Sequence, residues 1–213
     1  VARLIGINQA ARTTCIKPAG TTSLVLGTSS GIHAWHNDYY IRRLRVGKNE
    51  PIYKYLKENN PDLIEDEYFR PHDTAVIEIP QSAPKGSILR TESAFDLLKR
   101  VKKVATEWVK PGHRRGSNTH NVSATISLKQ EDWDKAGKWM WDNRDCYNGL
   151  SVLPYDGGTY TQAPFEDITK KEFDKRVKSL NDVDLSNITE ATDETDLSGE
   201  LACAGGSCEI TSL

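Results

Sequence analysis

Asn121-Val-Ser-Ala-Thr-Ile-Ser-Leu128 alternates small, polar and apolar residues in the manner of a β-strand. A tryptophan-rich segment that contains Trp133, Ala136 and Met140 follows it and is predicted to be a helix. Leu150–Leu153 is then a second short apolar run with the length of a strand. Strand, helix and strand in this order are typical of an α/β arrangement. We therefore predict an α/β fold, and no internal repeat is visible in the chain.

The flanking segments continue this alternation. Ala75-Val-Ile-Glu-Ile-Pro80 is predicted to be a short strand that is stopped by its proline. Thr169-Lys-Lys-Glu172 has the spacing of a capping box and predicts a last helix that runs towards Leu180. Thr91 is predicted to cap another helix, whose apolar face would consist of Phe95, Leu98, Val101, Ala105 and Trp108.

The composition changes beyond Ser179. From there the chain has eight acidic residues, no Lys or Arg and few large apolar side chains. Such a stretch cannot bury enough surface to offset the entropy lost on ordering. We therefore predict two parts: a folded α/β portion over residues 1–180, and a flexible acidic tail over residues 181–213 that carries a terminal pair of cysteines.

Overall composition restricts the function classes. The chain has 213 residues, 37% of them hydrophobic, and a formal net charge of -2, which gives no electrostatic reason to expect nucleic-acid binding. It shows no apolar run that could span a bilayer and no signal sequence, so no membrane association is expected. The isolated Cys15 and Cys146 favour a reducing cytoplasm, and we expect both to be small buried apolar residues. Val1–Ala11 resembles the interior of a longer protein, so we expect the natural chain to continue upstream.

Lys17-Pro-Ala-Gly-Thr-Thr-Ser23 is a candidate phosphate loop. Its proline-glycine turn lets the backbone approach a ligand closely, and three hydroxyl side chains follow at once. A helix that starts near Thr22 would point its free N–H groups and positive dipole end at an anion. The Gly-Lys-Ser/Thr ending of a Walker loop is missing. A hydroxyl-capped turn into a buried helix explains the same residues, and from this segment alone it is the simpler interpretation.

Cys203-Ala-Gly-Gly-Ser-Cys208 lies at the end of the acidic tail. Two thiols separated by four residues, two of them glycine, can close a small disulfide ring with little strain. On a mobile tether they could visit a buried site and then exchange with an external dithiol. A metal site is a poorer interpretation, because the spacing is looser than in usual zinc sites and the histidines are far away in sequence. An incidental pair of exposed thiols is the third possibility, and the redox shuttle fits best.

Other polar residues give weaker signals. His33 and His36 flank Trp35 in a predicted loop, where a structural role is more common than a ligand contact. Arg42, Arg43 and Arg45 follow two tyrosines on a predicted strand, and a salt-bridged or solvated face explains them better than a substrate role. Nothing in the spacing predicts a Ser-His-Asp triad, a pair of catalytic carboxylates or a metal site.

Taken together, these segments resemble the C-terminal part of ribonucleotide reductases, and they are most like the adenosylcobalamin-dependent ribonucleoside-triphosphate reductases. The resemblance covers nearly the whole chain in the same order. The motifs that carry it, besides the cysteine tail, are Ile16-Lys-Pro-Ala-Gly-Thr-Thr-Ser-Leu24, Ser30-Gly-Ile-His33, Tyr39-Tyr-Ile-Arg-Arg43, His120-Asn-Val-Ser-Ala-Thr125, Tyr147-Asn-Gly-Leu-Ser-Val-Leu-Pro-Tyr-Asp156 and Tyr160-Thr-Gln-Ala-Pro-Phe-Glu-Asp167.

The resemblance implies a fold and a set of roles. The fold would be the later part of a ten-stranded α/β barrel. Cys203 and Cys208 would re-reduce an active-site disulfide and then be reduced by thioredoxin or a similar dithiol protein. The residues that would bind the phosphates of a ribonucleoside triphosphate are Pro18, Ala19, Gly20, Thr21, Thr22 and Ser23.

The chain also departs from the family. The Asn-Pro-Cys segment that carries the thiyl radical has no match here, so the radical cysteine, the active-site redox cysteines and most contacts to adenosylcobalamin are expected in an upstream part of the same enzyme. We therefore expect a partial chain or one piece of a split enzyme. Two alternatives stay open: a non-catalytic nucleotide-binding or interaction fragment, and a reductase that takes its radical from a di-iron subunit.

Overall fold

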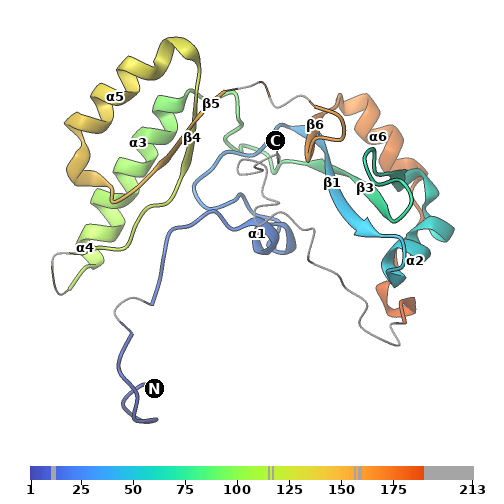
Figure 1. Ribbon diagram of the computed structural model, residues 1–213, viewed down its shortest axis with the longest axis horizontal. Helices are drawn as coiled ribbons and strands as arrows, with labels where there is room; N and C mark the ends of the chain where they lie inside the picture. Colours follow the sequence, from blue (N-terminus) through green and yellow to red (C-terminus); the bar gives the residue numbers. More distant parts are fainter. Residues whose placement is uncertain (11–12, 115, 117, 156, 158–159, 190–213) are drawn as a thin grey trace. The chain divides into compact units, whose positions relative to one another are not determined.

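The fold is that of a computed structural model, which describes residues 1–10, 13–114, 116, 118–155, 157 and 160–189 (Figure 1). The chain divides into two compact units. Unit 1 combines residues 1–34 with 92–155, and unit 2 combines 35–91 with the described residues from 157 onward. Among the described residues, no helix has both the length and the apolar character needed to cross a membrane.

Unit 1 is built from helices and a small parallel sheet. Strands β4 (Thr125–Leu128) and β5 (Ser151–Pro154) pair in parallel, with Thr125 opposite Ser151 and Leu128 opposite Pro154. Its helices are α1 (Gly20–Leu26), α3 (Ala94–Val104), the π-helical turn Ala105–Val109, α4 (Lys110–Gly112) and α5 (Trp133–Asp142). Short 3-10 turns cover Gln130–Asp132 and Arg144–Cys146.

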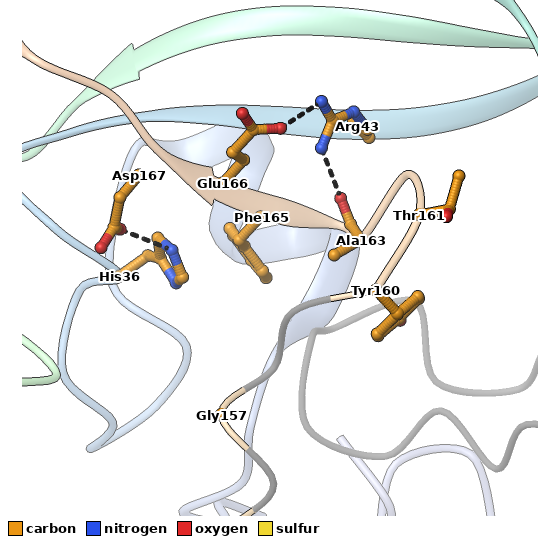
Figure 2. A pocket seen from close by; sticks show the side chains of 9 residues that line it. All are labelled: His36, Arg43, Gly157, Tyr160, Thr161, Ala163, Phe165, Glu166 and Asp167. Atoms are coloured by element: carbon orange, nitrogen blue, oxygen red, sulfur yellow. Dashed lines mark hydrogen bonds and ion pairs between the residues drawn. The ribbon is translucent and has the colours of Figure 1, made fainter.

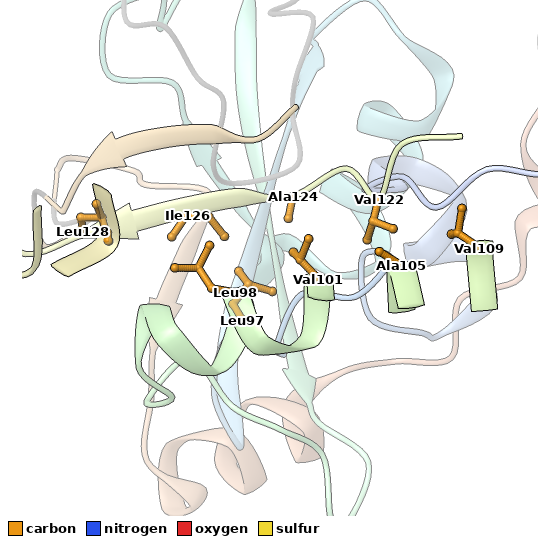
Figure 3. Packing of buried hydrophobic residues seen from close by; sticks show 10 residues of the cluster. Leu97, Leu98, Val101, Ala105, Val109, Val122, Ala124, Ile126 and Leu128 are labelled. Atoms are coloured by element: carbon orange, nitrogen blue, oxygen red, sulfur yellow. The ribbon is translucent and has the colours of Figure 1, made fainter. Parts of the chain in front are cut away.

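The core of unit 1 lies between α3 and β4 (Figure 3). Leu98 and Val101 from the helix and Ile126 and Leu128 from the strand are almost completely inaccessible to solvent. Because burial of a Leu or Ile side chain stabilises by roughly 1.5–3 kcal/mol, this cluster holds β4 firmly in place. Its buried members are Leu97, Leu98, Val101, Ala105, Val109, Val122, Ala124, Ile126, Leu128 and Ala136.

Unit 2 is a four-stranded antiparallel sheet in the order β2-β3-β1-β6. The strands are β1 (Tyr39–Gly47), β2 (Ile64–Asp66), β3 (Thr74–Ser82) and β6 (Phe165–Asp167). The helices are α2 (Pro51–Asn59) and α6 (Lys170–Ser179), with 3-10 turns at Pro61–Leu63 and Leu185–Asn187. A second core cluster, formed by Val46, Leu56, Leu63, Ala75 and Ile77, lies within this unit.

The α/β prediction is confirmed, and the details of several elements differ from it. Strand β3 runs through Pro80 to Ser82 instead of ending at the proline. Pro80 pairs with Ile41 of β1, but β2 extends only along Ala75–Ile77, so Pro80 has a sheet neighbour on one side only. A proline without an N–H group is tolerated at such an edge position.

The predicted cap and face of helix α3 were partly wrong. Ser93, not Thr91, is the N-cap: its side chain accepts from the N–H of Asp96, and the Asp96 carboxylate accepts from the Ser93 N–H in return. Trp108 is 66% exposed, whereas Val109 is buried. The π-helical turn explains this, because its wider i to i+5 spacing brings Val109 onto the apolar face and turns Trp108 away from it.

Two further predictions met different outcomes. The regular part of the strand predicted over 121–128 begins only at Thr125, although Val122 makes an isolated parallel bridge with Ile16. The last helix is confirmed, because Thr169 caps α6 by accepting from the N–H of Glu172. Residues 190–213, which include Cys203 and Cys208, lie outside the described part of the chain.

Candidate functional site

The predicted phosphate loop forms the start of helix α1 in unit 1. The helix begins at Gly20, two residues earlier than predicted, so Gly20 to Ser23 are its first turn. The first N–H groups of a helix have no preceding carbonyl within it to donate to. Thr22 is exposed, while Pro18 and Ala19, which precede the helix, are half-buried. The side chain of Thr21 lies outside what the structure describes.

Ser23 has a different position from the other hydroxyl residues of the loop. It is only 6% exposed, and its Oγ atom donates to the carbonyl oxygen of Gly20 at 2.7 Å. Its N–H donates to the carbonyl oxygen of Ala19 at 3.2 Å. The Ser23 hydroxyl therefore closes the helix turn on itself, whereas Thr22 remains on the surface where a ligand could reach it.

The entry to the loop is fixed to the framework of unit 1. Ile16 bridges to Val122, and the N–H of Ser123 donates to the carbonyl oxygen of Ile16 at 3.0 Å. On the other side, Gly31 (φ +60°) lies so close to Lys17 that an added Cβ would be 2.7 Å from the Lys17 carbonyl oxygen. The chain before the loop is thus held between the 122–123 segment that leads into β4 and the Gly31 turn.

His33 takes part in the same framework. Its Nδ1 atom lies 2.9 Å from the carbonyl oxygen of Ser30, and its Nε2 atom accepts from the backbone N–H of Thr125 at 3.1 Å. The carbonyl of the next residue back, Ile32, accepts from Arg100 at 2.9 Å, and Arg100 also binds Glu92. The structural role expected for His33 is therefore seen, and its neighbours connect the segment to α3.

Two other family-like motifs lie side by side in unit 1. The Asn121 side chain donates to the carbonyl of Gly149 at 3.0 Å and accepts from the Gly149 N–H at 3.2 Å. Asn148 donates to the carbonyl of Thr119 at 2.9 Å. The buried Nε2 of His120 has no hydrogen-bond partner among the described residues. Segments 119–122 and 147–151, remote in sequence, therefore share one network of hydrogen bonds.

Unit 2 contains a separate open pocket of about 650 Å³ (Figure 2). Strand β6 and the segment that leads into it form one wall. His36, which precedes β1, and Arg43, which lies in β1, face this wall. The residues that line the pocket are His36, Arg43, Gly157, Tyr160, Thr161, Ala163, Phe165, Glu166 and Asp167. Two of the lining residues, Glu166 and Asp167, have exposed carboxylates.

His36 is held against Phe165 and Asp167. The two rings stack with their centroids 4.9 Å apart, and Nε2 lies 3.0 Å from an Asp167 carboxylate oxygen. Burial, and then the positive charge of Arg90, lower the pKa of His36 to about 4, and the opposing effect of Asp167 is weaker. His36 is therefore neutral at pH 7, and Nε2, as the donor to a carboxylate, carries its proton.

Arg43 is the centre of an ion-pair network in the wall of the pocket. Its guanidinium donates to Glu78 at 2.7 Å, to the carbonyl of Ala163 at 3.1 Å and to Glu166. Arg176 of α6 binds the other oxygen of Glu78 at 3.0 Å. Burial by itself would lower the pKa of Arg43, but the hydrogen bonds that Arg43 donates to Glu166 and Glu78 raise it above its ordinary value. The salt-bridged interpretation of these arginines is thus confirmed for Arg43.

Gln162 adopts a conformation that is unusual for a residue other than glycine, with φ +55°. Its side-chain amide accepts from the N–H of Tyr68 at 2.9 Å and donates to the carbonyl of Asp66 at 2.8 Å. The turn that contains it is closed by the Ala163 N–H, which donates to the carbonyl of Tyr160 at 3.1 Å. Sequence analysis missed this residue, because nothing in the Gln-Ala-Pro stretch indicates a positive φ.

Two of the four cysteines, Cys15 and Cys146, lie in the part of the chain that the structure describes. Cys146 is half-buried, but Cys15 is exposed, so the expectation that Cys15 is a buried apolar residue was wrong. Its position explains this, because it precedes Ile16, the first residue of this segment that bridges to the framework. The predicted redox pair Cys203 and Cys208 lies outside the described residues, so its placement relative to the loop remains a prediction.

Comparison with known proteins identifies the chain's relatives. No family model matches. The chain is 28% identical over 210 residues to the adenosylcobalamin-dependent ribonucleoside-triphosphate reductase of Lactobacillus acidophilus, which covers 97% of this chain and 27% of the relative. Proteins of the same name from Euglena gracilis and Lactobacillus leichmannii are 28% and 26% identical over 95% and 98% of this chain.

A solved structure agrees with these sequences. A B12-dependent (class II) ribonucleotide reductase superposes with a TM-score of 0.66 and 27% identity, over 83% of this chain and 24% of that protein. The chain spans about a quarter of the length of the relatives it matches. It is therefore similar, over nearly its whole length, to one segment of an adenosylcobalamin-dependent ribonucleoside-triphosphate reductase, which confirms the family resemblance of its motifs.

Proposed function

We propose that this chain is part of a ribonucleotide reductase that converts ribonucleoside triphosphates to 2′-deoxyribonucleotides. The observation that carries the proposal is the similarity to reductases over 97% of the chain. In this proposal the described α/β segments are the later part of a ten-stranded barrel, and the remaining strands belong to the rest of the enzyme.

The proposed role of residues Pro18 to Ser23 is to bind the substrate phosphates. The free N–H groups at the start of α1 would donate to phosphate oxygens, and the exposed Thr22 hydroxyl would add a further donor. Ser23 would act indirectly, because its hydroxyl already binds Gly20. The fixed entry at Ile16 and Gly31 supports this role, since a preorganised loop loses less entropy when it binds an anion.

The proposed role of Cys203 and Cys208 is to return electrons to the active site. Their two thiols would give two electrons and two protons to an active-site disulfide, which becomes a dithiol while the tail pair becomes a disulfide. Thioredoxin or a similar dithiol protein would then reduce the tail by the reverse exchange. Location in a reducing cytoplasm is part of this proposal, because the external reductant must be available there.

Adenosylcobalamin is the cofactor named in the relatives. Among the described residues no three or more His, Cys, Asp or Glu side chains gather into a site for a metal ion. We propose that its contacts lie mostly in the rest of the enzyme.

The loop assignment is tested by Gly20→Val in the 213-residue chain. The branched side chain at the first position of α1 should weaken binding of a ribonucleoside triphosphate, measured by titration calorimetry, by about tenfold or more, which corresponds to about 1.4 kcal/mol. Gly137→Val is the matched control, because Gly137 lies in another helix of unit 1 with nothing within 4 Å of an added Cβ. Equal affinities for the wild type and Gly20→Val would count against the loop assignment.

The redox assignment is tested in the full-length enzyme, because the test needs the active site to which the tail cysteines would return electrons. Cys203→Ser and Cys208→Ser should each abolish turnover with thioredoxin but leave a single turnover of the pre-reduced enzyme intact. Unchanged thioredoxin-driven turnover would rule out the shuttle. A chain that binds nucleotide but supports no reduction with any reductant would instead favour the non-catalytic fragment. Turnover that depends on a di-iron partner and not on the cobalamin cofactor would favour the other alternative.

A further inference from the structure

His33 has both ring nitrogens bound to the backbone. Nδ1 lies 2.9 Å from the carbonyl oxygen of Ser30, which can only accept a hydrogen bond. Nε2 lies 3.1 Å from the backbone nitrogen of Thr125, which can only donate one. The two bonds are compatible with one form of the ring alone: neutral, with the proton on Nδ1 and a lone pair on Nε2 that accepts from Thr125.

One end of this bridge is rigid. Thr125 is the first residue of β4 and is 8% exposed. Strand β4 pairs with β5 and packs on α3 through the core of unit 1. The N–H of Thr125 is therefore a fixed point, and His33 takes its position from it.

The other end of the bridge supports the proposed phosphate loop. Ser30 accepts from His33, and the next residue, Gly31, approaches Lys17 and Pro18 closely: an added Cβ would be 2.7 Å from the Lys17 carbonyl oxygen and 3.3 Å from the Pro18 nitrogen. The 30–31 turn consequently determines where the peptide between Lys17 and Pro18 can lie. That peptide leads into the first residue of the loop.

We infer that His33 is a positioning residue for the phosphate loop, which it connects to β4 through the 30–31 turn. This inference rests on the proposed function of Pro18 to Ser23. His33 does not touch the phosphates itself. It keeps Ser30 and Gly31 against Lys17, and the loop is thereby held ready for a triphosphate before the ligand arrives. Loss of the bridge should cost affinity because the ligand must then order the loop itself.

The first test reads the tautomer directly. In a two-bond ¹H–¹⁵N correlation spectrum of the 213-residue chain at pH 7.5, His33 should show a protonated Nδ1 and an unprotonated Nε2. Addition of inorganic tripolyphosphate should shift the amide resonances of Ser30 and Gly31 and leave this tautomer unchanged. The opposite tautomer, or a doubly protonated ring, would overturn the inference, because neither can accept from Thr125.

The second test separates positioning from folding. His33→Phe fills the same space without either bond, whereas His33→Asn keeps a donor that can reach Ser30. Affinity for tripolyphosphate and for a ribonucleoside triphosphate should decrease in the order wild type, His33→Asn, His33→Phe. We expect the difference between the wild type and His33→Phe to be about fivefold or more, the lower end of typical coupling between sites. His72→Phe, an exposed histidine of unit 2, is the control and should bind like the wild type.

The outcomes distinguish the two proposals. If the wild type binds neither probe, the proposed phosphate loop fails and the inference fails with it. If the wild type binds and a folded His33→Phe binds equally well, the loop assignment survives and the inference is overturned. If His33→Phe does not fold, His33→Asn decides: this variant has lost the acceptor for the Thr125 N–H, so an unaltered affinity in it overturns the inference.

Discussion

The carbonyl oxygen of Lys17 lies 2.7 Å from the point that a Cβ atom of Gly31 would occupy. Real Cβ atoms do not approach backbone oxygens so closely, and Gly31 also has φ +60°. Gly31→Ala should therefore destabilise unit 1 by about 2–4 kcal/mol, as the sum of a left-handed alanine and a backbone clash. Chemical unfolding followed by tryptophan fluorescence measures the loss.

Gly27→Ala is the matched control for this change. Gly27 has the same φ of +60°, but nothing lies within 4 Å of an added Cβ. It should lose only the cost of the left-handed backbone, about 1–2 kcal/mol. Equal losses in the two variants would show that Gly31 is needed for its backbone conformation alone and that its contact with Lys17 has no energetic role.

Gln162 has a strained backbone, and its side-chain amide makes hydrogen bonds with Tyr68 and Asp66. Two substitutions separate the cost of the strain from the contribution of these hydrogen bonds. Gln162→Gly and Gln162→Ala both remove the hydrogen bonds to Tyr68 and Asp66, but only glycine relieves the strain of φ +55°. The alanine variant should therefore be less stable than the glycine variant by about 1 kcal/mol. In both variants the amide of Tyr68 should exchange its hydrogen faster with solvent, because it loses its acceptor. An unchanged exchange rate at Tyr68 would show that the Gln162 side chain does not protect this amide.

The predictable part of the fold is the part with local signals. The capping pair at Thr169 and the apolar spacing of Leu98 and Val101 predict helices that the structure contains. The cap at Ser93 was missed because Thr91 offers the same hydroxyl two residues earlier. Trp108 was misplaced because a π-helical turn has no signature in an apolar pattern with the period of an α-helix.

The division into two units has little local signal in the sequence. The chain passes between the units at 34–35, 91–92 and 155–156, and only the last of these points, which Asp156-Gly157-Gly158 follows, has the composition of a turn or linker. Because each unit is assembled from two separated stretches, its core depends on long-range packing that spacing along the chain does not encode.

The candidate site was predictable to a similar degree. The loop at Pro18 to Ser23 could be found because proline, glycine and hydroxyl residues have direct conformational meanings. The residues that hold the loop in place could not be predicted. His33, which contacts Ser30, also contacts Thr125, and these two residues are 92 positions apart in the sequence. The ion pairs of Glu78 could have been predicted from the sequence. Glu78 is a carboxylate inside the apolar run Ala75–Pro80, and a buried carboxylate must be paired.

Glu78 is 4% exposed and binds Arg43 and Arg176 through different oxygens. Glu78→Gln keeps the shape but turns an amide NH₂ group towards one of the two guanidiniums and leaves both cations without their shared anion. We expect unit 2 to lose about 3–5 kcal/mol of unfolding free energy. Glu166→Gln is the control, because the Glu166 side chain is 52% exposed and its pair with Arg43 should contribute less than about 1 kcal/mol. Similar losses of unfolding free energy in the two variants would show that the burial of Glu78 does not make its ion pairs more important for stability than the exposed pair of Glu166.

His36 should make the stability of unit 2 depend on pH. Its pKa is lowered from 6.5 to about 4, first by burial and then by the charge of Arg90. Between these two values the unfolded chain binds a proton that the folded chain does not, so the unfolding free energy should fall as the pH is lowered from about 6.5 to 4. The His36 contribution should then level off at lower pH, where both states are protonated.

The measurement is an NMR titration of His36, together with urea unfolding at several pH values between 4 and 7. His36→Phe is the informative variant, because an aromatic ring can still stack on Phe165 while the ionisable group is gone. The loss of stability in this pH range should be smaller in the variant than in the wild type. A His36 resonance that titrates near 6.5 would mean that the ring is solvated and that its contact with Asp167 does not hold it in the buried position.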